Sequence, residues 1–378
     1  MMTMRRLHIV RFYHVIWLVC VTLYGSQPVF ATHPDGYFPD APVPVPTPMP
    51  GYSMVPHIAL ILPLQSRAFG SAAELVKQGF TTAAEREAAL PLIVRIYSTT
   101  DDPLDVLITY HQALDAGAVF VVGPLTRNGV TALASSHVVA VPTLALNSTD
   151  RDMMLPPNLF LFGLQSESEA VYIAEMALSA GKSHAIIIQD NSGLSQRLQR
   201  AFADRWLSEF GNTAESIEYD EPQGFFSRLR KYTGGEQNLV FLALDANKAR
   251  RIRPYLNPQT PVYATSQVFV TREDPLFNHD LNGIRFMDMP WLLQPDHPAV
   301  MAYRSTDKAR DKDSERLFAL GIDAFRLMRY MLQMHSPYNI AFDGVTGNIR
   351  FAAPANFIRE PVAARIDGGK VKVLENRR

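Results

Sequence analysis

The stretch AVFVVGPLTRNGVTALASS, residues 118–136, decides the fold. An apolar run at 119–122 ends at Gly-Pro, and the turn Leu-Thr-Arg-Asn-Gly leads into a helical pattern. This order predicts a buried strand followed by a helix whose first N–H groups face the space beyond the strand end. Open α/β sheets collect their ligands in that space, so the turn is the first candidate for a binding site.

The same alternation extends in both directions along the chain. Up to residue 146 we predict strands at 58–62, 93–97, 119–122 and 141–146, and helices at 72–89, 104–116 and 130–136. After the apolar run 159–162 a second array follows, with helices at 168–180, 194–210 and 225–231 and strands at 185–188, 215–219, 239–244 and 262–264. Continuous apolar strands between helices indicate parallel strands buried on both faces. The predicted fold class is therefore α/β, with a doubly wound, mostly parallel sheet in each of two lobes.

The C-terminal part of the chain completes these lobes and is too short for a third core. It contains an apolar helix at 317–333, a hairpin at 342–351 around a glycine turn, and a second hairpin formed by 362–366 and 371–374.

Composition places the chain among globular proteins and argues against nucleic-acid binding. Its 378 residues are 47% hydrophobic and 19% charged, which suffices for two domain-sized cores. The formal net charge is −1 and no basic stripe is visible, so nucleic-acid recognition has no electrostatic footprint.

The N-terminal 31 residues have the pattern of a secretory signal peptide. Arginines precede an apolar run, and a small-residue cleavage site ends at Ala31. We therefore expect a periplasmic protein. Cleavage would remove Cys20, the only cysteine, so no disulfide could form. Lipidation at Cys20 is the less favoured alternative, because Val19 is larger than the residue that normally precedes a lipidated cysteine.

Residues 32–56 form a proline-rich linker. Proline at nearly every second position of 39–50 predicts an extended polyproline II segment. Such a segment is either a disordered leader or a spacer that holds the folded part away from a membrane or wall.

The residues show no catalytic constellation. Metalloprotease, CxxC, nucleophile-elbow and P-loop motifs are absent. The pair Asp101-Asp102 reads as a helix start, and Glu167 and Glu169 fit the first turn of a helix, where they offset its dipole. We predict a non-enzyme without a metal or cofactor.

Four polar turns follow predicted strands at the edge where ligands bind. They contain Gln65, Ser66 and Arg67; Thr126, Arg127 and Asn128; Asn147, Ser148 and Thr149; and, in the second lobe, Asp190, Asn191 and Ser192. The same residue types cap helices, so capping and ligand contact both remain open for each of them.

Short motifs in the chain resemble the type I periplasmic binding-protein fold. The hairpin with Phe342, Gly344, Gly347, Ile349 and Phe351 is similar to one in the branched-chain amino-acid binding family. A nearer resemblance is to the LppC/LpoA-type penicillin-binding protein activators, and covers about residues 57–374. The segments that carry it are 122–125, 145–147, 263–266, 283–286 with Pro290, and 317–325.

This resemblance implies two lobes joined by three crossings, near Phe162, Met289 and Ala353. Lobe one would comprise 57–161 and 290–352, and lobe two 162–289 and 353–378. The activators resemble lipoproteins with a long helical-repeat region ahead of this domain, whereas here a proline-rich linker of about 25 residues stands in that place.

The resemblance also implies an altered cleft. By this resemblance, the neutral Gln267 takes the position of the family's ammonium-binding glutamate, and Arg127 takes that of a serine in the first-lobe turn. Asp245 is the alternative candidate for the missing acid. The cleft is therefore expected to be vestigial or to serve a different ligand, for instance an anion or a protein carboxylate.

These features lead to two functional hypotheses. The first is a non-catalytic periplasmic regulator that binds and stimulates a peptidoglycan synthase, a class A penicillin-binding protein. The alternative is a substrate-binding protein of an ABC transporter for a small polar solute such as an amino acid.

Overall fold

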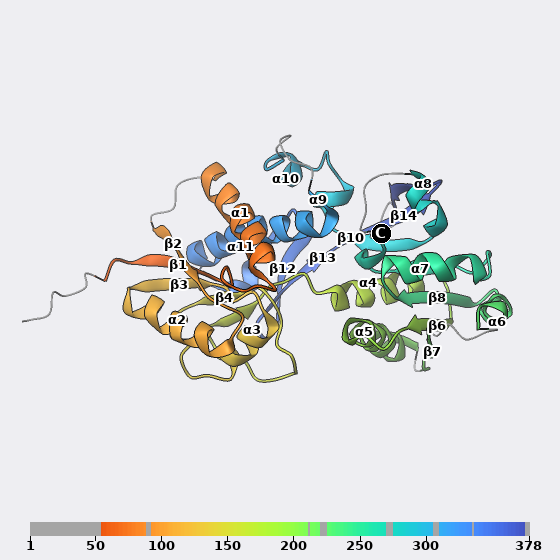
Figure 1. Ribbon diagram of the computed structural model, residues 1–378, viewed down its shortest axis with the longest axis horizontal. Helices are drawn as coiled ribbons and strands as arrows, with labels where there is room; N and C mark the ends of the chain where they lie inside the picture. The colour runs from red at the N-terminus through yellow and green to blue at the C-terminus, as the bar shows by residue number, and fades with distance from the viewer. Residues whose placement is uncertain are drawn as a thin grey trace, which may run out of the picture. The chain divides into compact units, whose positions relative to one another are not determined.

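The computed structural model describes residues 54–87, 92–210, 212–219, 225–269, 275–304, 310–334 and 336–374. These form two α/β lobes, each built around one mostly parallel sheet (Figure 1). The predicted signal peptide and all of the linker up to residue 53 lie outside the described residues. In the part of the chain described, no helix combines the length and apolar character needed to cross a membrane.

The first sheet has the strand order β11-β12-β13-β5-β4-β3-β1-β2. Its strands are β1 (His57–Leu62), β2 (Ile93–Ser98), β3 (Ala118–Val122), β4 (Thr143–Ala145), β5 (Leu159–Leu161), β11 (Ala341–Asp343), β12 (Asn348–Ala352) and β13 (Asn356–Glu360). All neighbours pair in parallel except β11 with β12 and β12 with β13.

The second sheet has the order β15-β14-β10-β9-β8-β6-β7. Its strands are β6 (His184–Gln189), β7 (Glu215–Glu218), β8 (Asn238–Ala243), β9 (Val262–Ala264), β10 (Arg285–Asp288), β14 (Val362–Asp367) and β15 (Lys370–Val373). Antiparallel pairing is confined to β10 with β14 and β14 with β15.

Helices cover both faces of each sheet, as the continuous apolar strands predict. In the first lobe, Ile58 and Leu60 pack with α1 (Gly70–Arg86) and α11 (Lys312–Gln333), while Ala59 and Ile61 pack with α2 (Pro103–Asp115) and α3 (Arg127–Ala134). In the second lobe, α4 (Ser166–Ser179) and α5 (Gly193–Phe210) cover one face, and α6 (Phe225–Tyr232) and α7 (Ala246–Ile252) cover the other (Figure 1). The predicted fold class is confirmed.

Short helices lie around the second crossing and at the edge of the second lobe. They are the 3-10 segments Ser266–Val268 and His279–Leu281, and α8 (Pro275–Asn278), α9 (Pro290–Leu293) and α10 (Pro298–Met301).

The structure corrects two expectations. The third crossing does not lie near Ala353, because β13 folds back on β12 and also pairs with β5, so it belongs to the first sheet. The chain instead passes to the second sheet between Glu360 and Val362. In addition, the predicted strand at 93–97 is not buried on both faces: β2 is an edge strand, and Ile93 and Ile96 are 55% and 46% exposed.

The helices α1 and α11 cross at two glycines. A Cβ atom on Gly79 would lie 1.9 Å from the Phe318 carbonyl oxygen, and one on Gly321 would lie 2.1 Å from the Val76 carbonyl oxygen. Because both contacts are with backbone, no rotamer change could relieve them, and the two helix axes depend on the absence of side chains here.

We therefore expect Gly321→Ala to force α1 and α11 apart and to lower the free energy of unfolding by about 1–3 kcal/mol. Urea denaturation followed by circular dichroism measures this. Gly193→Ala is the matched control, because a Cβ there would meet its nearest atom, Arg197 Nη1, at 3.5 Å. Equal stability of the two variants would contradict the packing argument.

Candidate functional site

A cavity of about 470 Å³ opens where β3 and β4 end in the first lobe. Its apolar lining includes Leu125, Leu146, Leu164, Leu317 and Leu320. The polar side chains that line it are Asp101, Thr126, Arg127, Asn128, Asn147 and Asp150. Four of the predicted site residues, Thr126, Arg127, Asn128 and Asn147, are thus brought together here.

Two of the polar side chains that line this cavity already form hydrogen bonds within the protein. Thr126 is the N-cap of α3 and accepts a hydrogen bond from the Gly129 N–H. The Asn147 amide donates to the Leu125 carbonyl and accepts from the Ser148 N–H. For both residues the structure shows the capping or turn-stabilising role that the sequence left open against ligand contact.

The turn that carries Arg127 lies close against β1. Gly123 has φ +108°, and a Cβ there would be 2.0 Å from the Ile61 carbonyl oxygen. Only glycine suits this backbone, so the turn is held in one place above the sheet.

Arg127 itself reaches across to the second lobe. Its Nη2 donates to Glu167 Oε1 at 2.7 Å, and Arg197 Nε donates to the same oxygen at 2.7 Å. Glu167 lies in the first turn of α4 and Arg197 lies on α5. Burial acts to raise the pKa of Glu167, but its backbone hydrogen bond and the two arginines outweigh burial and hold that pKa below the usual 4.5.

The second-lobe candidates surround a separate, smaller cavity of about 110 Å³. Asp190, Ser192, Asp245 and Gln267 all line it. Lys248 Nζ lies 2.5 Å from Asp190 Oδ2 and 3.7 Å from Asp245 Oδ2. Asp245 also accepts from two N–H groups as the N-cap of α7. Both carboxylates that could receive a ligand ammonium therefore already have partners within the protein.

The remaining candidates lie outside these two cavities. Ser66 is buried and accepts from the N–H groups of Ala68 and Phe69, while Gln65 and Arg67 are exposed beside it. Asn191 is exposed. Ser148 and Thr149 line a third cavity of about 640 Å³ between the lobes, together with Arg127, Glu167 and Arg197.

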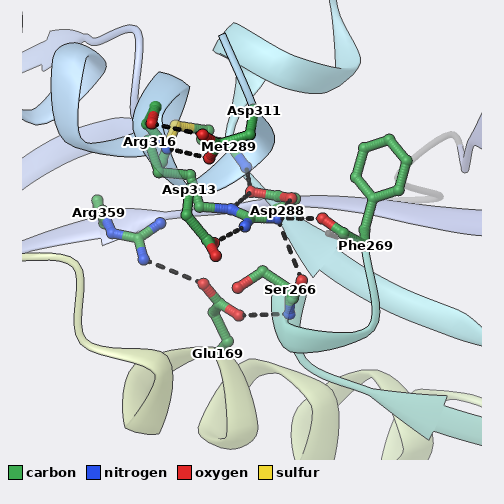
Figure 2. A network of polar contacts seen from close by, with 10 residues as sticks. Glu169, Ser266, Phe269, Asp288, Met289, Asp311, Asp313, Arg316 and Arg359 are labelled. Carbon is green, nitrogen blue, oxygen red and sulfur yellow. Dashed lines mark hydrogen bonds and ion pairs between the residues drawn. The ribbon is translucent and has the colours of Figure 1, made fainter. Parts of the chain in front are cut away.

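A buried network of charges joins the lobes close to the crossings (Figure 2). Arg316, on α11 of the first lobe, donates from Nη2 to Asp288 Oδ2 at 2.6 Å and from Nε to Asp288 Oδ1 at 3.2 Å. Its Nη2 also donates to the carbonyl oxygens of Ser266 and Phe269 at 3.1 and 2.8 Å. Asp288 ends β10, directly before the second crossing.

The second half of the network is the pair Glu169 and Arg359. Arg359 Nη2, on β13, donates to Glu169 Oε1 at 3.1 Å, and the Ser266 N–H donates to Glu169 Oε2 at 2.8 Å (Figure 2). Burial raises the pKa of Glu169 even though Arg359 acts to lower it. Burial acts to lower the pKa of the Arg316 guanidinium, but Asp288, together with Asp313 and Glu169, outweighs burial and raises that pKa.

The partners in these contacts cannot be read from the sequence. Glu167 and Glu169 lie in the first turn of a helix, as predicted, but their ion pairs were not predicted. Residue spacing gives no signal for a contact such as Glu169 with Arg359, which are 190 positions apart. The apolar run LFALGIDAF that directly follows Arg316 is a local hint that this charge is buried.

Comparison with known proteins shows which proteins share this architecture. The family model described as "LppC putative lipoprotein" matches residues 52–238 and 228–361. The penicillin-binding protein activator LpoA of Haemophilus ducreyi is 26% identical over 329 residues, covering 85% of this chain and 55% of that protein. The chain spans about half the length of the curated relatives it matches.

Two solved structures are similar along most of the chain. One, of a putative branched-chain amino acid ABC transporter from Chromobacterium violaceum, is 35% identical with a TM-score of 0.71, and the match covers 82% of this chain and 99% of that one. The other is the C-domain of Haemophilus influenzae LpoA, described as a regulator of PBP1A. It is 21% identical with a TM-score of 0.72, covers 84% of this chain and 100% of that one, and shows the fold.

We expect Glu169→Gln to lower the free energy of unfolding by about 3 kcal/mol, because it leaves the buried Arg359 without a counter-charge. Arg359→Met should cost a similar amount, and the double variant should be less destabilised than the two costs added. Chemical denaturation of all three variants measures the coupling. Glu209→Gln, which breaks the exposed pair with Arg205, is the control and should cost less than about 1 kcal/mol. Strict additivity would contradict the coupling.

The Arg127–Glu167 contact predicts a dependence on pH. The pKa of Glu167 is lower in the folded chain, so its stabilising contribution is present above about pH 4.5 and is lost as the pH falls through the lowered value. Glu167→Gln should therefore reduce stability by about 1 kcal/mol at pH 7. The difference from the unmodified protein should shrink below pH 4, and thermal denaturation across pH measures it. A difference that stays constant with pH would show that Glu167 does not act through its charge.

Proposed function

Because the chain belongs to the LppC family, we propose that it is a non-catalytic regulator of the cell envelope that binds and stimulates a peptidoglycan synthase. Its relatives named as penicillin-binding protein activators, and the LpoA C-domain described as a regulator of PBP1A, support this assignment. The partner would be a class A penicillin-binding protein, and the place of action the periplasm.

The observation that carries the proposal is the internal pairing of charges at the candidate cavities, both between the lobes and in the second lobe. A free amino acid needs a donor set for its carboxylate and an acid for its ammonium. Here Arg127 is bound to Glu167, and Asp190 and Asp245 face Lys248. Capturing an amino acid would first require breaking these pairs, which favours a protein partner over a free solute.

The similarity to the Chromobacterium violaceum structure supports the second candidate function. That protein is described as a branched-chain amino acid ABC transporter, and the match covers nearly all of it at 35% identity. A solute-binding protein would need Arg127 to exchange Glu167 for a ligand carboxylate when the lobes bind the solute.

Two alternatives remain for the N-terminus. The description of the family as lipoproteins supports lipidation at Cys20 and attachment to the membrane, whereas cleavage after Ala31 would release the chain. Mass spectrometry of the mature N-terminus separates these outcomes.

A binding and activity experiment tests the two functions together. The purified protein is immobilised and a purified class A penicillin-binding protein is passed over it, and the rate of peptidoglycan polymerisation is measured with and without the protein. We expect retention of the synthase and a rate increase, with no heat of binding for leucine by calorimetry. Saturable leucine binding without synthase retention would overturn the regulator proposal in favour of the solute-binding one.

A further inference from the structure

A further cavity of about 680 Å³ lies between the second lobe and the segment that follows the second crossing, and it shares no lining residue with the three cavities described above. On the second-lobe side it is lined by α8 and by the turn that begins β15. On the other side it is lined by α9 and by Arg304, after α10. None of the predicted site residues lines it.

A buried asparagine, Asn278, belongs to the lining of this cavity. Asn278, at the end of α8, is 1% exposed, and its Oδ1 atom has no hydrogen-bond partner among the residues that the structure describes. A buried amide normally has its hydrogen bonds satisfied, because leaving one unmade is costly. The two ends of an asparagine amide can exchange places, so Asn278 can offer either an acceptor or a donor to a molecule in the cavity.

Two cations stand at the cavity with no counter-charge among the described residues. Arg304 and Lys370 are both exposed, and neither forms an ion pair with any residue that the structure describes. Lys372, two positions along the same strand, differs in that its Nζ lies 2.5 Å from Asp367 Oδ2. Among the described residues, the lining carries the two cations Arg304 and Lys370 and no acidic side chain.

The rest of the lining is mostly apolar and well buried. Phe269 is 2% exposed, and Leu292 and Leu293 are each 8% exposed. Val371 completes this surface beside Lys370. An occupant would thus meet cations and a free amide at one part of the cavity and hydrocarbon at another.

We propose that this cavity binds an organic phosphate, with the phosphate group at Arg304 and Lys370 and its apolar part against Phe269, Leu292 and Leu293. A phosphate supplies the negative counter-charge for both cations. Its oxygens can accept hydrogen bonds from them and from the Asn278 amide. The cavity shares no lining residue with the cavities of the candidate functional site, so the proposal does not depend on synthase binding.

Titration calorimetry on the purified protein tests the ligand class with three matched probes. Phenyl phosphate has both the charge and the apolar body, inorganic phosphate has only the charge, and benzyl alcohol has only the body. We expect saturable binding of phenyl phosphate that is at least about tenfold tighter than that of either fragment. Equal affinity for phenyl phosphate and benzyl alcohol would overturn the phosphate site. Absence of saturable phenyl phosphate binding, together with absence of retention in the vesicle experiment below, would also overturn it.

Variants identify the cavity as the place of binding. The double change Arg304→Gln with Lys370→Gln should weaken phenyl phosphate binding by at least about tenfold, whereas the control Lys372→Gln should leave it unchanged. Asn278→Leu should also weaken binding while the melting temperature of the free protein stays level or rises, because an unpaired buried amide is removed. A purely structural asparagine would instead give a lower melting temperature and unchanged binding, which would contradict its role in the site.

Two natural sources carry this chemistry: a soluble phosphate ester and the headgroup of an anionic lipid. Co-sedimentation with phosphatidylglycerol vesicles, compared with phosphatidylcholine vesicles, separates them. Retention that the double variant abolishes identifies the lipid source, and phenyl phosphate binding without retention identifies a soluble ester. If neither probe binds in a way that depends on Arg304 and Lys370, the proposal is wrong.

Discussion

The arrangement of the two lobes depends on the buried contacts of Arg316 and Arg359 with Asp288 and Glu169. Asp288 immediately precedes the second crossing, Arg359 lies one residue before the end of β13 and the third crossing, and Glu169 follows the first crossing in α4. One cluster therefore ties together the three places where the chain changes lobe (Figure 2). Buried charges require correctly placed partners, so this cluster tolerates little displacement of one lobe against the other.

The sheets could be predicted from the sequence because burial on both faces makes parallel strands continuously apolar. The runs at 58–62, 185–188 and 239–244 became β1, β6 and β8, with helices on both sides. The strand β13 escaped prediction because its sequence NFIRE carries two charges, one of which is the buried Arg359. Edge position explains the other failure: β2 has a neighbouring strand on one side only, so Ile93 and Ile96 stay partly exposed although they look like core residues in the sequence.

The sequence indicated several polar residues that line the cavities, but not the residues with which they form ion pairs. Polar turns after apolar strands do line cavities, at Thr126, Asn147 and Asp190. What these side chains do is set by partners distant in the chain, such as Glu167 for Arg127 and Lys248 for Asp190. Local sequence can show that a side chain suits a cap or a ligand, but the choice between them depends on tertiary contacts.

These partners change what the cleft has to do. In a two-lobed receptor, a ligand supplies the charges that hold the lobes together. Here the chain brings its own carboxylate, Glu167, to Arg127 across the lobes, and its own ammonium, Lys248, to the acids of the second lobe. Together with the buried network, the Arg127–Glu167 contact joins the lobes without the free energy of a bound solute. Lobes that are held together without a ligand suit a regulator that presents one fixed surface to a partner. A receptor that opens and closes around its ligand does not need such contacts.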